Sequence, residues 1–221
     1  MAQVPDGVVH HGQVASVSIS QATECGTVYT LDEISAIKDV CRSRSVPLHM
    51  DGARFANALV TLGCSAADMT WKAGVDVLSF GGSKNGALAL EAVIFFNPSL
   101  GDDFIYRQKR SGHVLSKMRL MTAQMEAYLA DGLWVNNARQ ANAMAKRLAD
   151  GLAALDVETA DPVDGNQVFP LMPQAMAAAL QAAGFLFYDR GPVSAEDDRR
   201  RVRLVCAFNS TEAEIDAFLS G

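Results

Sequence analysis

The stretch from Leu48 to Phe96 restricts the possible folds of this chain more than any other part of it. It contains two short apolar runs, and each leads into a charged residue, Asp51 after the first and Lys84 after the second. Their separation in sequence matches one strand–helix–strand crossover. Because such a crossover joins parallel strands, we expect both side chains at the same edge of one sheet, where open α/β sheets bind their ligands.

The composition allows a sizeable core and argues against two classes of partner. The chain has 221 residues, 49% of them hydrophobic and 20% charged, enough for one large domain or two small ones. Its net charge of −6 gives no basic field, so we expect no nucleic acid partner. No apolar run approaches the ~20 residues that span a bilayer, and residues 1–13 lack the pattern of a secretory signal. We therefore expect a cytoplasmic protein without a membrane partner.

The four cysteines are scattered along the chain, without the spacing of a metal site. Isolated thiols are typical of buried positions in proteins from a reducing compartment. We therefore expect no bound metal and four unpaired thiols, namely Cys25, Cys41, Cys64 and Cys206.

Apolar and amphipathic runs alternate along the chain, which predicts an α/β fold. Strands are expected at residues 14–20, 46–50 and 75–80, and the turn signal Asn85-Gly86 predicts an antiparallel return at 92–96. Capping boxes predict helices that begin after Thr30 and Thr211. Further helices are expected at 55–63, around Trp71, at 134–155 and at 173–183, and further strands near 168–172, 185–188 and 202–208.

Two of the expected helices carry apolar stripes that predict which side faces a core. In the first helix the stripe consists of Leu31, Ile34, Ile37 and Val40. In the long helix at 134–155 it consists of Ala141, Met144, Leu148, Leu152 and Leu155.

Lys84 follows Gly81-Gly82-Ser83 at the end of an apolar strand. Glycines at this position let a cofactor approach the backbone, and partial desolvation frees a lysine amine as a nucleophile. The alternative is a lysine that extends from a strand end into solvent. A phosphate-binding P-loop is excluded, because the sequence GGSKNG lacks the required glycine spacing and the GK[ST] ending.

Asp51 and Arg54 lie at the other strand end. An aspartate there can cap the following helix, or it can hold a proton on a pyridine nitrogen and keep the ring an electron sink. Arg54 can bind a phenolate or a carboxylate, or it can be a solvated surface residue. Together with Lys84, the pair offers an imine-forming amine, a pyridinium partner and an anion binder at one sheet edge.

The segments DGARF, TWKAGVDVLSFGGSKNG, EAVIFFNP and QATECGTVY resemble the low-specificity L-threonine aldolases, which are fold-type-I enzymes dependent on pyridoxal 5′-phosphate (PLP). The resemblance covers nearly the whole chain. It implies that Lys84 bonds to the cofactor, that Asp51 pairs with the pyridine nitrogen, and that Arg54 lies near the ring oxygen or the substrate carboxylate. It also implies that residues 1–100 belong to the large PLP-binding domain, 101–133 to a helical connection and 134–221 to a small C-terminal α+β domain.

Two basic segments extend the resemblance. DRRRVRLVCAFNST resembles the late strand whose arginine binds the substrate carboxylate, and the register favours Arg203. Solvated alternatives are Arg199, Arg200 and Arg201. YRQKRSGHVLSKMR resembles the segment that reaches the cofactor phosphate, partly across a dimer interface, which makes Lys109 and Arg119 candidates. A solvated basic helix face is the alternative for this segment.

The chain also departs from the family pattern. The family carries, upstream of the matched segments, a Gly/Thr phosphate loop and an aromatic residue, usually histidine, stacked on the ring. The resemblance therefore implies that roughly the first third of the usual chain is missing. His10 and His11 do not replace the stacking residue, His113 is expected at the surface, and His49 is expected to pack in the core.

The activity that the resemblance implies is retro-aldol cleavage of L-threonine or L-allo-threonine to glycine and an aldehyde, in a homodimer or homotetramer. The substrate partner is thus a small amino acid. Two alternatives stay open: another PLP enzyme of the same fold, such as a β-eliminating lyase or an aminotransferase, or a non-catalytic fragment. The sequence does not identify the base for the β-hydroxyl proton.

Overall fold

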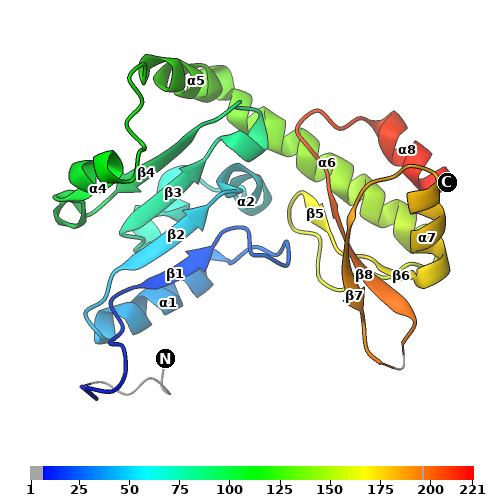
Figure 1. Cartoon of the computed structure of the whole chain (residues 1–221), viewed down its shortest axis with the longest axis horizontal. Helices are drawn as coiled ribbons and strands as arrows, with labels where there is room; N and C mark the ends of the chain where they lie inside the picture. The colour runs from blue at the N-terminus through cyan, green and yellow to red at the C-terminus, as the bar shows by residue number, and fades with distance from the viewer. Residues whose placement is uncertain (1–6, 196) are drawn as a thin grey trace.

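The computed structural model describes residues 7–195 and 197–221 and contains two sheets, one near each end of a long helix (Figure 1). The first sheet has the order β1 (Val17–Ser20), β2 (Leu48–Gly52), β3 (Val77–Gly81) and β4 (Glu91–Phe95). The first three strands are parallel, and β4 is antiparallel to β3. The predicted crossover and the predicted antiparallel return are therefore both confirmed.

One face of this sheet is covered by the helices α1 (Leu31–Ser43), α2 (Phe55–Leu62) and α3 (Ala66–Met69) and the 3₁₀ turn η1 (Trp71–Ala73). The capping box at Thr30 is confirmed, since its hydroxyl accepts from the Glu33 amide and its own amide donates to the Glu33 carboxylate at 2.8 Å. One prediction is wrong: Val40 is 46% exposed, and Cys41 is buried instead. The reason is helical geometry, because Cys41 lies two full turns after the buried Ile34.

The other face of the first sheet is polar and partly open. It carries Ser18, His49, Asp51 and Ser79, which alternate along the strands with the buried core residues. His49 forms hydrogen bonds with Ser18 Oγ through Nδ1 at 2.8 Å and with Ser79 Oγ through Nε2 at 2.9 Å, and so joins three parallel strands. The expectation of a histidine packed in the core is therefore wrong, because the two-residue period of β2 turns His49 away from the helices.

Beyond β4 the chain is helical. The 3₁₀ turn η3 (Pro98–Gly101), α4 (Phe104–Arg110), α5 (Arg119–Leu129) and the turn η4 (Ala130–Gly132) lead into α6 (Leu133–Ala154). Figure 1 shows α6 running from the first sheet to the second. Trp134 packs against the first core, whereas Leu148 and Leu152 lie in the second. Leu155 is 49% exposed, contrary to the prediction, because the helix ends one residue before it.

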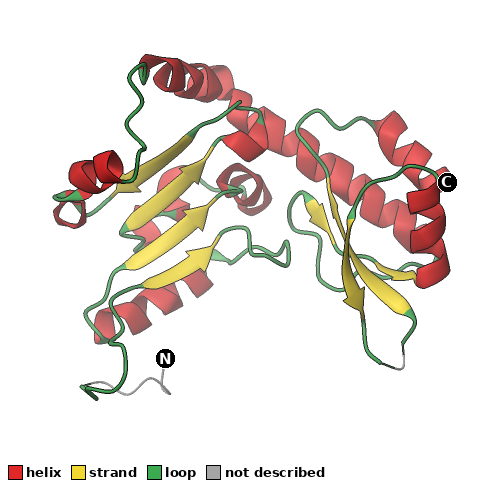
Figure 2. Cartoon of the chain, viewed as in Figure 1, coloured by secondary structure: helices red, strands yellow, loops and turns green. Residues whose placement is uncertain are grey.

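The second sheet is antiparallel and is built around β8 (Arg199–Val205). Its other strands are β5 (Gln167–Val168), β6 (Leu171–Pro173) and β7 (Tyr188–Pro192), and the helices α7 (Gln174–Ala182) and α8 (Glu212–Ser220) lie beside it (Figure 2). The strand predicted at 168–172 is split into β5 and β6. The strand predicted at 185–188 begins only at Tyr188, because Phe185 and Phe187 pack on Phe218.

Each half of the structure has its own hydrophobic core, one under the first sheet and one under β8. This arrangement supports the division at residues 1–100, 101–133 and 134–221, which stays a prediction. The prediction that residues 1–13 lack a secretory signal falls partly on residues 1–6, which lie outside the described residues. Within the described residues, no helix has both the length and the apolar character needed to cross a membrane.

A mostly buried ion pair holds the first sheet to α1. Lys38 Nζ lies 2.6 Å from Asp76 Oδ2, and the same carboxylate oxygen accepts from the Leu48 amide at 2.7 Å. We expect Asp76→Ala to lower the free energy of unfolding by about 3 kcal/mol, because it leaves the Lys38 cation without its partner in a mostly buried site. Urea denaturation measures the change. The control is Asp39→Ala at the exposed Asp39–Arg42 pair, where we expect at most about 0.5 kcal/mol; equal losses in both variants would contradict the prediction.

Candidate functional site

Asp51 and Lys84 lie at the same edge of the first sheet, as the crossover spacing predicts. Asp51 is on β2 and pairs in register with Ser79 of the neighbouring parallel strand β3. That strand ends at Gly81, and Lys84 follows in the 3₁₀ turn η2 (Ser83–Asn85). A Cβ atom on Gly81 would lie 2.8 Å from the Ala53 Cα, so the chain leaving β3 passes directly against the residues that follow Asp51.

The Lys84 side chain is exposed, and no described residue forms a hydrogen bond or ion pair with its amine. Its neighbour Asn85 is 4% exposed and anchors the turn. The Asn85 Nδ2 group donates to the Tyr128 hydroxyl at 2.7 Å and to the Trp134 carbonyl at 2.8 Å, and the Asn85 carbonyl accepts from Asn137 Nδ2 at 2.9 Å. The amine therefore extends from a rigid turn rather than from a mobile loop.

The turn also requires a glycine. Gly86 has φ +112°, and a Cβ there would lie 2.6 Å from Asn137 Nδ2. Burial raises the pKa of the neighbouring Tyr128 phenol, so the hydroxyl that accepts from Asn85 stays protonated. The sequence indicates the Asn85-Gly86 turn but not this role of Asn85, because its partners come from helices 43 to 52 residues further along the chain.

Asp51 is half-buried, and only part of its hydrogen-bonding capacity is used. Its Oδ1 accepts from the Ala53 amide at 2.9 Å, and its carbonyl accepts from the Gln21 amide at 2.8 Å. The first residue before α2 is Arg54, so Asp51 does not cap that helix directly. Among the described residues none donates to Asp51 Oδ2, which leaves this oxygen available to a ligand.

The charges of Arg54 and Arg203 interact, although the two residues come from opposite halves of the chain. Burial lowers the pKa of the Arg54 guanidinium, and the positive charge of Arg203 lowers it further, whereas the carboxylates of Glu24 and Asp51 act in the opposite direction. No described carboxylate forms an ion pair with either guanidinium. Two neighbouring cations without a bonded carboxylate are an anion-binding arrangement.

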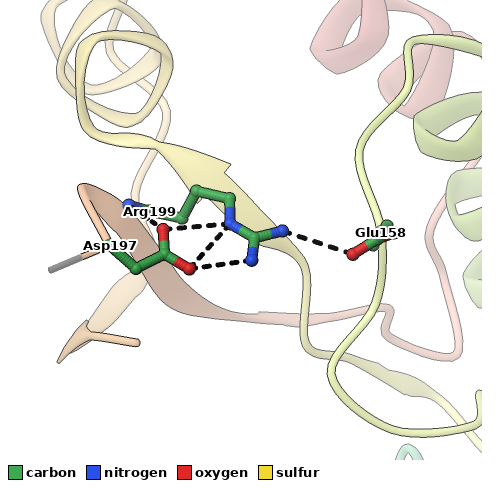
Figure 3. Close-up of polar contacts among 3 residues, drawn as sticks. All are labelled: Glu158, Asp197 and Arg199. Atoms are coloured by element: carbon green, nitrogen blue, oxygen red, sulfur yellow. Dashed lines mark hydrogen bonds and ion pairs between the residues drawn. The ribbon is translucent and has the colours of Figure 1, made fainter. Parts of the chain in front are cut away.

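The three alternative arginines on β8 each have a carboxylate partner. Figure 3 shows Arg199 between Asp197 and Glu158. The hydrogen bonds that the Arg199 guanidinium donates to Asp197 lower the pKa of the Asp197 carboxyl group. Arg200 pairs with Asp189 at 2.7 Å, and Arg201 pairs with Asp161 and lies over the Phe169 ring. The expectation of simply solvated side chains is therefore wrong for all three, because they are partly buried and ion-paired.

The structure does not bring Lys109, one of the two phosphate candidates, to this edge within the chain. Lys109 is exposed on α4, and the ring of Phe104 at the start of this helix contacts Phe95. Phe95 pairs with Val77 at the beginning of β3, so α4 lies at the opposite edge of the sheet from Lys84. Arg119 is exposed at the first position of α5. No described interaction joins either residue to Asp51 or Lys84.

Sequence reasoning missed one further polar residue of this region. Gln167 is 1% exposed and faces the Arg203 guanidinium. The sequence did contain a signal for a buried polar residue here, because Asn166 and Gln167 directly precede an apolar run, and buried amides need specific partners.

Within the described residues, no cluster of His, Cys, Asp or Glu could hold a metal ion, and the four cysteines are unpaired.

Comparison with known proteins gives a consistent result. Residues 2–175 match the family described as beta-eliminating lyase. A low-specificity L-threonine aldolase from a Pseudomonas species is 43% identical over 94% of this chain and 58% of its own length, and one from Pseudomonas aeruginosa is 46% identical over 81% of this chain and 52% of its own length. The resemblance to threonine aldolases seen in the sequence is thus confirmed, and the chain spans about half the length of these relatives.

The fold has a close counterpart among solved structures. A threonine aldolase from Leishmania major is 30% identical and superposes with a TM-score of 0.89, covering 96% of this chain and 61% of that one. This match confirms the predicted α/β fold class.

Proposed function

The chain belongs to the beta-eliminating lyase family, and on that basis we propose that its site serves a PLP-dependent threonine aldolase. The reaction is the cleavage of L-threonine or L-allo-threonine into glycine and an aldehyde. The observation that carries the proposal is the combination at one sheet edge of an unpaired Lys84 amine, a partly free Asp51 carboxylate and the Arg54–Arg203 pair.

The donor set fits PLP. An aldehyde-bearing cofactor needs a primary amine to bond to, and the Lys84 amine is accessible on an anchored turn. A pyridine nitrogen needs a carboxylate that keeps it protonated, and Asp51 Oδ2 is available beside this turn. When bound, PLP supplies an electron sink that weakens the bonds to the substrate Cα.

The protein groups have separate tasks in this proposal. Asp51 holds the proton on the ring nitrogen, and its own orientation is fixed by the Ala53 amide. Arg54 and Arg203 bind the substrate carboxylate, which sets the direction of the bond between Cα and Cβ. The ion pairs of the three other β8 arginines support the choice of Arg203 as the substrate ligand.

We also propose a homo-oligomer in the cytoplasm. Lys109 and Arg119 are both exposed, and Lys109 lies at the opposite end of the sheet from Lys84, which supports the view that these residues reach the phosphate bound to a neighbouring copy. Four unpaired cysteines support a reducing compartment.

The test is an aldolase assay on the PLP-loaded chain. We expect L-allo-threonine to give acetaldehyde and glycine in equal amounts, measured by coupled reduction of the aldehyde and by amino-acid analysis. L-Tyrosine as a second substrate tests the alternative of a β-eliminating lyase, which would release phenol. Phenol without acetaldehyde would favour the alternative, and no product from either amino acid would contradict catalysis by this chain.

A further inference from the structure

The guanidinium of Arg203 is held by a neutral amide. When the Gln167 amide is oriented with its oxygen toward the arginine, that oxygen lies 3.0 Å from Nε and 3.0 Å from NH2. This orientation follows from the chemistry, since a guanidinium only donates hydrogen bonds and an amide nitrogen cannot accept them. Gln167 therefore takes the Nε/NH2 edge of the guanidinium and leaves the NH1/NH2 edge for a ligand.

The surroundings prevent Gln167 from leaving this position. It is 1% exposed on β5, and its backbone pairs with Val205 of β8. The loop at Gly26 closes over it, since a Cβ on Gly26 would lie 3.2 Å from Gln167 Cβ, and Gly26 has φ +82°. Asp164 ties this loop to the segment before β5, because its carboxylate accepts from the Val28 amide at 3.0 Å.

Arg203 differs from the neighbouring arginines in the charge of its partner. Arg199, Arg200 and Arg201 are each neutralised by a carboxylate, whereas the described partner of Arg203 carries no charge. A fully buried glutamine is also costly unless its amide is used, so an apolar residue would suit β5 better if only packing mattered. An amide can fix the guanidinium without cancelling its positive charge.

We propose that Gln167 is the positioning residue for Arg203, which it orients to bind a carboxylate end-on through NH1 and NH2 while leaving its charge uncompensated. The inference rests on the proposed function for the identity of the ligand, an amino-acid carboxylate. Arg203 without this contact has the rotamer freedom of a long flexible side chain and must lose it on binding.

The experiment follows the Arg203 Nε–H group directly, by ¹⁵N NMR on the full chain without cofactor, with acetate as the carboxylate probe. Arg203→Lys assigns the signal. In the unchanged chain we expect a resolved signal in slow exchange with water that shifts on titration with acetate. Gln167→Met keeps the size of the side chain without the acceptor, and we expect about tenfold faster exchange and about tenfold weaker acetate binding.

Gln167→Glu separates orientation from charge. It keeps the acceptor, so we expect Nε–H to stay protected, but it neutralises Arg203, so acetate binding falls by about tenfold. Gln140→Met on the exposed face of α6 is the matched control and should change neither measurement. If Gln167→Met does not fold, as judged by circular dichroism, the Gln167→Glu arm still decides the question.

Two results would overturn the inference: unchanged Nε–H exchange in Gln167→Met, or full acetate binding in Gln167→Glu. Neither measurement needs PLP or turnover. A chain that fails the aldolase assay but shows the expected exchange pattern would contradict the proposed function alone. A chain that passes the assay with an unprotected Arg203 would contradict the positioning role alone.

Discussion

Replacing Lys84 with alanine is expected to abolish covalent attachment of PLP to the chain. The side chain is exposed, has no described partner and extends from a turn that Asn85 fixes beside the end of β2 that carries Asp51, so we expect its amine to react with the PLP aldehyde. Incubation with PLP, reduction with borohydride and peptide mapping by mass spectrometry measure the attachment. We expect the label on Lys84 in the unchanged chain and its complete loss from that peptide in the variant.

The control is Lys146→Ala, which removes an exposed lysine on α6 that pairs with Asp150. Labelling of Lys84 should be unchanged in this variant. If borohydride fixes PLP to several surface lysines equally and Lys84 is not preferred, the assignment of Lys84 fails, whatever the activity of the chain.

The second large effect is expected in the first core. Phe55 is 1% exposed, and its ring is 5.7 Å from that of Phe80 and 6.3 Å from that of Trp134, measured between centroids. We expect Phe55→Ala to lower the free energy of unfolding by about 3–5 kcal/mol, because it removes a large buried ring and leaves a cavity. Urea denaturation followed by tryptophan fluorescence measures the loss and reports the change around Trp134.

Leu186→Ala provides the comparison, since Leu186 is 97% exposed. We expect a change within about 0.5 kcal/mol for this variant. A loss below about 1 kcal/mol in Phe55→Ala would mean that the cluster collapses into the vacated space, and that the ring stacking does not hold α6 against the sheet.

The sequence predicts the first hundred residues well because their signals are local. A capping box such as Thr30–Glu33 depends on four consecutive residues, and the crossover between Asp51 and Lys84 depends on spacing and strand direction. The errors come from helix phase, as at Val40, and from short strands such as β5 and β6. Those strands contain two and three residues, so they are too short for a periodic pattern.

The parts of the site that sequence does not predict depend on contacts between distant segments. Gln167 meets Arg203 because β5 and β8 pair in the second sheet, and Arg54 approaches Arg203 because the two sheets face a common region. Similarly, Glu158, Asp189 and Asp161, which pair with Arg199, Arg200 and Arg201, come from other loops and strands, although Arg199 also pairs with the adjacent Asp197. The sequence register already favours Arg203, but only the tertiary structure shows that the other three arginines of β8 are paired with carboxylates.

The long helix α6 has a mechanical consequence for the site. Its 22 residues form a lever arm of about 33 Å, with the turn of Lys84 bound near one end and β8 packed near the other. A tilt of about 3° would displace the far end by about 2 Å, and misplacement by about 1 Å can reduce a reaction rate about 100-fold. A tilt this small disturbs the site without unfolding the protein. We therefore expect substitutions that loosen the second core to impair alignment of the site before they cause unfolding.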